Sequence, residues 1–153
     1  MLKDGIDLFQ KQVYSTAQTH FQDYLNAVGY KGTSSPTRYS LGEANFYYAA
    51  CAVELFQDDA QGLMEKFIAN YPESPKVVLA HFHLGKLFFR KRDWDKAVEQ
   101  LLATDIYQLN TDQYIEYCFK LGYAYYMLKD YDNALVQFDK IKDEKNIHRP
   151  ETH

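Results

Sequence analysis

The stretch HFHLGKLFF, residues 81–89, has a counterpart in CFKLGYAYY, residues 118–126. Each is followed by an alanine with a large apolar residue four positions later, in AVEQL at 97–101 and in ALVQF at 134–138. Glycine and alanine are 12 residues apart in both copies, and the copies are 37 residues apart. A period of this length predicts repeated helix pairs, in which each pair stacks on a neighbour to bury its apolar side.

The repeated glycine indicates where two helices approach each other. Glycine inside a helix costs about 1 kcal/mol relative to alanine, so we expect a position that tolerates no side chain. The alanine of the second helix would lie opposite, and Trp94 and Tyr131 would fill the turn end of their pairs. The predicted repeat signature consists of Gly5, Ala17, Leu84, Gly85, Ala97, Leu121, Gly122 and Ala134.

Two further repeats precede this pair. Near the N-terminus, Gly5 is again followed 12 residues later by Ala17. The next repeat is degenerate, because Ala50 takes the place of the glycine and Ala60 follows after only 10 residues. We expect its helices at residues 39–56 and 60–70, from their apolar periodicity.

Short polar segments separate the predicted repeats. Ser35 and Pro36 predict a helix start, and the segment YPESP at 71–75 repeats this Ser-Pro arrangement with Ser74 as the cap. Asn110 is expected to cap the helix that follows. The expected organisation is a single domain over residues 1–145, followed by a frayed tail at 146–153. The repeats of the domain are expected at about 1–28, 36–70, 75–104 and 112–141.

Over roughly residues 1–141 the pattern resembles the tetratricopeptide repeat, W-x2-L-G-x2-Y…A-x3-F. The resemblance implies an all-α fold, an α-solenoid of about four antiparallel helix pairs wound into a right-handed superhelix. It also implies a non-enzymatic scaffold that binds protein or peptide partners on its concave face during assembly of a larger complex. The linker at 71–75 looks like that of bacterial cell-envelope repeat proteins, such as the outer-membrane assembly lipoproteins and the periplasmic protein that works with the Tol–Pal system.

Positions counted from each glycine predict which side chains face the inner surface. They form an aromatic groove in which Lys86 and Arg90 would favour an acidic or carboxylate-bearing segment. The alternative is that these rings only pack between repeats, and the sequence leaves both interpretations open. The predicted groove residues are Tyr47, Phe82, Lys86, Phe89, Arg90, Phe119, Tyr123, Tyr126 and Met127.

Composition argues against several other functions. The net charge of −4 indicates no nucleic-acid surface, and neither a catalytic motif nor a set of metal ligands is found, so we expect no enzyme, cofactor or metal. No apolar run reaches the length of a membrane helix. The chain is expected to be cytoplasmic, or periplasmic or outer-membrane associated if an export signal was removed. Three alternatives remain open. The chain could self-associate, it could belong to a longer repeat array in which further repeats cover its face, or it could be an accessory domain of an enzyme.

Overall fold

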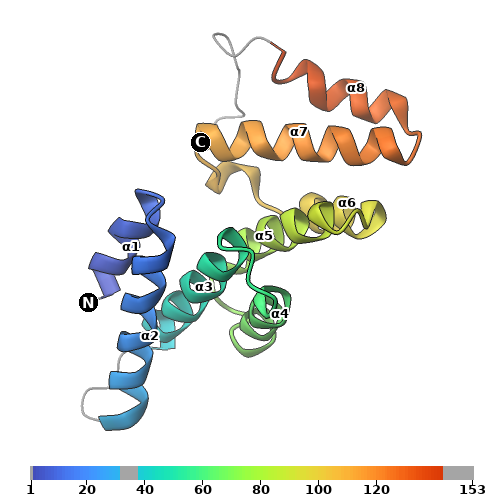
Figure 1. The fold of residues 1–153 in the computed structure, drawn as a ribbon. Coiled ribbons are helices and arrows are strands. Elements are labelled where there is room, and N and C mark those ends of the chain that lie inside the picture. Colours follow the sequence, from blue (N-terminus) through green and yellow to red (C-terminus); the bar gives the residue numbers. More distant parts are fainter. Residues whose placement is uncertain (1, 32–37, 143–153) are drawn as a thin grey trace. The chain divides into compact units, whose positions relative to one another are not determined.

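The computed structural model describes residues 2–31 and 38–142, without the side chains of residues 29–31. In these residues every regular element is helical, and no strand occurs (Figure 1). The predicted fold class is confirmed: this is an all-α chain of tetratricopeptide-like helix pairs, of the α-solenoid class. The elements are α1 (Leu2–Gln10), α2 (Tyr14–Lys31), α3 (Arg38–Glu54), α4 (Ala60–Asn70), α5 (Val77–Arg90), α6 (Trp94–Leu102), the 3-10 turn η1 (Ile106–Gln108), α7 (Thr111–Met127) and α8 (Tyr131–Asp139).

Predicted helix boundaries agree with these bounds to within two residues in the degenerate repeat, where helices were expected at 39–56 and 60–70. The predicted cap at Ser35 and Pro36 and the predicted tail at 146–153 lie outside the described residues. The chain divides into two compact units, Met1–Ala80 and His81–His153. The grouping of residues 1–145 into one domain stays a prediction.

Helices contact mainly their neighbours in sequence. In the first unit α1 packs on α2, α2 on α3 and α3 on α4, and in the second unit α6 packs on α7 and α7 on α8. A pair of reciprocal hydrogen bonds reinforces the first unit, since the side-chain amides of Gln18 and Gln57 donate to each other at 2.8 and 2.9 Å. These bonds join α2 to the turn between α3 and α4.

Close helix approach at the glycines is confirmed. A Cβ on Gly85 would lie 2.6 Å from Leu101 Cδ2, and one on Gly122 would lie 2.8 Å from the Phe138 ring. The signature residues opposite and beside the glycines are buried as well, and these are Ala17, Leu84, Ala97, Leu121 and Ala134. At Gly5 the ring of Phe21 lies 2.8 Å from such a Cβ. The helices can therefore pack this closely only because these positions carry no side chain.

The four turns inside the helix pairs share one backbone conformation. Gln12, Phe56, Arg92 and Lys129 all have φ between 60° and 65°. In each turn this residue donates its N–H to the carbonyl three positions back, and the next residue donates to the carbonyl five positions back. These are Schellman caps, in which glycine normally occupies the left-handed position. None of the four is glycine here.

Replacing Lys129 by glycine should therefore stabilise the protein. Lys129 is exposed, and the left-handed conformation costs about 1–2 kcal/mol for a residue with a Cβ. The greater freedom of glycine in the unfolded chain offsets about half of this gain, so we expect Lys129→Gly to raise the free energy of unfolding by roughly 0.5–1 kcal/mol in urea denaturation. Lys129→Ala should give no increase. Equal stability of the two variants would contradict this account of the turn.

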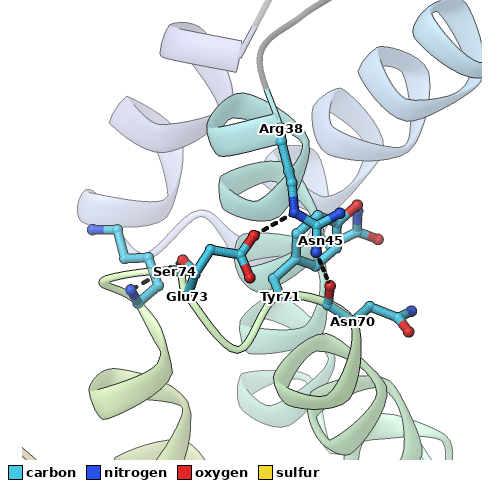
Figure 2. Close-up of polar contacts among 7 residues, drawn as sticks. Arg38, Asn45, Asn70, Tyr71, Glu73 and Ser74 are labelled. Carbon is cyan, nitrogen blue, oxygen red and sulfur yellow. Dashed lines mark hydrogen bonds and ion pairs between the residues drawn. The ribbon is translucent and has the colours of Figure 1, made fainter.

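The linker at residues 71–75 is held against α3 by Arg38 (Figure 2). The guanidinium group donates to the Glu73 carboxylate and to the carbonyl of Asn70, the last residue of α4. Its carbon also lies 4.8 Å from the centre of the Tyr71 ring. The predicted cap by Ser74 is found, since the Ser74 hydroxyl accepts from the backbone N–H of Lys76 at 3.1 Å. One cation thus closes the C-terminal end of α4 and fixes the linker.

This ion pair predicts a pH dependence of stability. The hydrogen bond from Arg38 lowers the pKa of Glu73 below its ordinary value, with a smaller effect from its own backbone. A lowered carboxyl pKa contributes stability above the unfolded pKa of about 4.3, and the contribution is lost as the pH falls through the folded pKa. Thermal melts should show a deficit of Glu73→Gln near neutral pH that vanishes in acid. The deficit of Glu73→Gln should be small, because the Arg38–Glu73 pair is exposed. Glu99→Gln, a control at an exposed site, should show no such deficit.

Candidate functional site

An open groove of about 490 Å³ lies in the second unit, where the end of α5, the following turn, the start of α6 and one side of α7 come together. It brings together five of the predicted residues, which are Phe89, Arg90, Phe119, Tyr123 and Met127. Two further lining residues, Arg92 and Trp94, were not predicted for the groove.

Four aromatic rings form the body of the groove. The Phe89 ring meets the Trp94 ring edge to face at 5.4 Å and the Tyr123 ring at 5.5 Å. Trp94 and Tyr123 are 5.6 Å apart, and Phe119 lies 6.1 Å from Tyr123. These distances lie in the range preferred by aromatic pairs, so each ring is held in place by others. The aromatic cluster, as we call Phe89, Trp94, Phe119 and Tyr123, is a preorganised surface.

One side of the groove is a stripe on α7. Phe119, Tyr123 and Met127 follow each other at intervals of four, which places them on one face of the helix. Their side chains remain 47%, 38% and 42% exposed. Large apolar residues that stay exposed together on one helix face are typical of an interaction surface.

The charged residues that line the groove are both cationic. Arg90 and Arg92 contribute to its wall, and among the residues that the structure describes the lining includes neither Asp nor Glu. A third cation lies close by, since Lys120 Nζ is 4.7 Å from the centre of the Phe89 ring. Lys120 also pairs with Glu116 at 3.5 Å. The groove therefore combines aromatic rings with cationic side chains at its wall.

The predictions for Lys86 and Phe82 need correction, because neither side chain lines the groove. Only 7% of the Lys86 side chain is exposed, and its Nζ pairs with Glu116 Oε1 at 3.7 Å and lies 5.0 Å from the centre of the Phe82 ring. Phe82 is fully buried, with its ring 6.4 Å from that of Tyr117. All of residues 82–88 are buried, so counting from the glycine could not tell a groove position from a core position.

Tyr47 and Tyr126 also lie elsewhere. Tyr47 belongs to the core of the first unit, where its ring contacts those of Phe9 and Phe21 at 5.1 and 5.4 Å. Tyr126 is 54% exposed and meets the ring of Tyr131 edge to face at 5.5 Å, outside the groove lining. Tyr131 thus packs across the turn end of its pair, as expected, but it is 56% exposed and covers that end only in part.

Both cysteines, Cys51 and Cys118, and the imidazole of His83 are buried. Burial raises the pKa of Cys51 to about 12 and also raises the pKa of Cys118, which keeps both thiols protonated and unreactive at neutral pH. Burial, with a contribution from Lys86, lowers the pKa of His83 well below its ordinary value. His81 is engaged by Gln100, with 2.7 Å between Nδ1 and Oε1. Over residues 2–31 and 38–142 no cluster of His, Cys, Asp or Glu has the arrangement of a metal site.

Comparison with known families agrees with two of the helix pairs, α3–α4 and α7–α8, and includes the packed glycine at Gly122. A family model described as the tetratricopeptide repeat matches residues 43–74 and 119–144. Over these two segments the chain is similar to tetratricopeptide repeats. The first match covers much of the degenerate repeat, and the second contains the α7 stripe and α8. Repeats of this kind generally mediate contacts between proteins.

Neither the curated proteins nor the solved structures gave a significant match to the chain. Among the described helices, none combines the length and the apolar character needed to span a bilayer. The repeat match and the groove thus carry the functional argument.

Proposed function

We propose that the protein is a non-enzymatic scaffold whose second unit holds a segment of a partner protein in the groove between α5, α6 and α7. The aromatic cluster carries this proposal. Its rings are packed on one another at 5.4 to 6.1 Å, yet Phe119 and Tyr123 keep 47% and 38% of their surface exposed. Tetratricopeptide repeats generally serve protein–protein interaction, and the groove lies on residues that include part of the second repeat match.

Preorganised rings suit this role energetically. Binding usually immobilises flexible side chains at about 0.5–1.5 kcal/mol each, whereas Trp94 and Tyr123 are already fixed by mutual contact. Tyrosine and tryptophan in desolvated pockets are also the residues that most often dominate interface energies. A bound segment would cover the exposed faces of these rings and exclude water from them.

Tyr123→Ala should weaken partner binding by about 1–2 kcal/mol, which is roughly tenfold or more in affinity. The reason is the loss of the ring that contacts Phe89, Trp94 and Phe119 at once. Tyr107→Ala is the matched control, because Tyr107 is an exposed ring on η1 outside the groove lining. Titration calorimetry with the captured partner measures both. Equal affinities of the two variants would argue against the groove.

Site-specific photo-crosslinking would capture the partner. A photoreactive phenylalanine derivative replaces Met127, which lines the groove and is 42% exposed, in cells of the source organism. Irradiation should give a discrete adduct that is lost when Tyr123→Ala is added. The same probe at Tyr107 should not give this adduct. Adducts of equal intensity from both positions would contradict the proposal.

A second candidate is that another helix covers α8, as in a longer repeat array or a self-associated form. Tyr131 is the repeat equivalent of Trp94, whose ring contacts Tyr123 of the following helix, α7. In contrast, Tyr131, Leu135 and Val136 of α8 are 56%, 60% and 51% exposed. A photo-crosslinker at Leu135 tests this candidate, and sedimentation of Leu135→Glu against the parent tests self-association.

We also propose that the protein works in the bacterial cell envelope, where it takes part in the assembly of a larger complex. Support for this placement comes from the linker at 71–75, which Arg38 holds in place and which resembles that of envelope repeat proteins. Fractionation of source cells that carry an epitope-tagged chromosomal copy tests it. Recovery with the periplasm or outer membrane is expected, and recovery with the cytoplasm would overturn this placement.

A further inference from the structure

We infer that Lys120 is a positioning residue of the groove, whose ammonium group keeps the Phe89 ring in the aromatic cluster while Glu116 keeps the ammonium group over that ring. This role rests on the proposed function, because the aromatic cluster is the surface that would receive a partner segment. Lys120 is not one of the described residues that line the groove. It therefore acts on a bound segment through Phe89 and not by direct contact.

The Phe89 ring joins two other rings of the cluster. It meets the rings of Trp94 and Tyr123 at interplanar angles of 76° and 64°, so both contacts are edge to face. Lys120 Nζ lies 4.7 Å from the centre of the Phe89 ring, within the distance of about 6 Å over which a cation is attracted to a ring face. Removing the cation thus takes away one of the contacts that fix the ring on which Trp94 and Tyr123 both pack.

Glu116 holds the Lys120 ammonium group in place. The two residues are one turn apart on α7, with the acid on the N-terminal side, which is the more favourable order. Only 21% of the Lys120 side chain is exposed, compared with 61% for Lys96 and 72% for Lys142, which also pair with a nearby acid. Because an enclosed pair is screened less by water and salt than an exposed one, this ammonium group stays over the ring.

The same carboxylate ties α7 to the interior of the second unit. Glu116 Oε1 lies 3.7 Å from Lys86 Nζ, and Glu116 Oε2 lies 3.5 Å from Lys120 Nζ. Lys86 and Phe89 are three residues apart on α5, and Glu116 and Lys120 are four apart on α7, so each pair shares one helix face. An ion pair and a cation–ring contact therefore join the same two faces, and Lys120 is the residue at which the ion pairs meet the aromatic cluster.

The position of the Phe89 ring affects binding through the population of the competent cluster. When only a fraction of the molecules has the binding conformation, the apparent dissociation constant rises in inverse proportion to that fraction. Loss of a cation–ring contact at a partly exposed site changes such an equilibrium by about two- to fivefold. Affinity should therefore fall by up to this factor, although no contact with the ligand is removed.

Fluorescence of Trp94 tests the role without a ligand. Trp94 is the single tryptophan of the chain and its ring contacts that of Phe89. Lys120→Met should move its emission to longer wavelength and increase its quenching by acrylamide, and Lys120→Arg, which keeps a cation able to stack on a ring, should restore both. Lys142→Met is the matched control, because it removes a lysine from an exposed pair with Asp139, and it should change neither. Circular dichroism confirms that each variant is folded.

A binding measurement tests the consequence for the groove. Random peptides displayed on phage are selected on the parent chain, and one is chosen that has no charged residue, has blocked ends and loses binding with Tyr123→Ala. Lys120 cannot attract this peptide directly by charge. Lys120→Met should weaken its binding by about two- to fivefold, and Glu116→Gln should act in the same direction. Lys120→Arg should restore the affinity, and Lys142→Met should leave it unchanged.

The outcomes separate this role from the proposed function. An unchanged Trp94 signal in Lys120→Met, a changed signal with parental affinity, or no recovery with Lys120→Arg would overturn the positioning role. If Tyr123→Ala abolishes binding while Lys120→Met affects neither binding nor fluorescence, the groove binds as proposed and only the role of Lys120 fails. If no selected peptide depends on Tyr123, the proposed function fails and the positioning role fails with it.

Discussion

Gly85→Leu should lower the free energy of unfolding by about 1–3 kcal/mol or more, in urea or thermal denaturation. Even the first added atom would lie 2.6 Å from Leu101 Cδ2, 2.7 Å from Leu101 Cγ and 3.4 Å from the Leu101 backbone nitrogen. Both close contacts are with the Leu101 side chain, which is fully buried, so any rotamer change that moves these atoms away has to take place inside a packed core. The gain in helix propensity, about 1 kcal/mol, is too small to compensate.

Gly62 offers a matched control for this effect. It lies in α4, is exposed, and has no heavy atom within 4 Å of the position that a Cβ would take. Gly62→Ala should therefore raise stability by roughly 0.5–1 kcal/mol through helix propensity alone. Adding Leu101→Ala to Gly85→Leu should restore part of the lost stability. A Gly85→Leu protein as stable as the parent would show that α5 and α6 do not need the glycine.

Lys86→Glu should destabilise the protein by about 2–4 kcal/mol. The Lys86 side chain is only 7% exposed and pairs with Glu116. Glutamate at this position would place a second carboxylate beside Glu116 in a site with little access to water. Equilibrium urea denaturation measures the loss, which should diminish in acid as the carboxylates become protonated.

Lys86→Met is the control, because it keeps the aliphatic stem and removes the charge. Replacement of a buried ion pair member by an apolar side chain of similar volume should change stability by no more than about 1 kcal/mol once Glu116→Gln is added. A stable Lys86→Glu protein would mean that Lys86 reaches solvent after all. The prediction also implies that Lys86→Glu is a poor probe of binding, whereas Arg92→Glu changes an exposed residue.

The helix pairs were predictable because the repeat imposes its own spacing. A glycine and an alanine 12 residues apart require two helices that cross closely, and the structure places Gly85 and Gly122 against Leu101 and Phe138. Caps were equally readable, since Asn110 accepts from the Gln113 N–H and the Gln113 side chain bonds back to Asn110. Helix caps and the spacing within a helix pair depend on residues close together in the sequence, so both could be predicted without knowledge of the tertiary structure.

The groove was predictable on α7 and at the end of α5, where Phe89 and Arg90 line it, but not earlier in α5. On α7 the stripe of Phe119, Tyr123 and Met127 is exposed, as expected. On α5 residues 82–88 are all buried, so helical spacing alone placed Phe82 and Lys86 on the wrong surface. Arg92 and Trp94 were missed because the prediction considered only the first helix of each pair. The available signal was the run KRDW at 91–94, where cations precede a tryptophan at the turn.

Packing between consecutive helices also determines how the chain folds. Because α1 to α4 contact mainly their sequence neighbours, as do α6 to α8, each contact closes only a short loop, and the entropy of loop closure stays small. Chains dominated by such local contacts fold on the microsecond to millisecond timescale. Linear arrays also open one helix at a time, so amide hydrogen exchange should be graded along the sequence. Slowest exchange is expected in α3, where most residues from 42 to 53 are buried, and faster exchange in α8, where only Ala134 is.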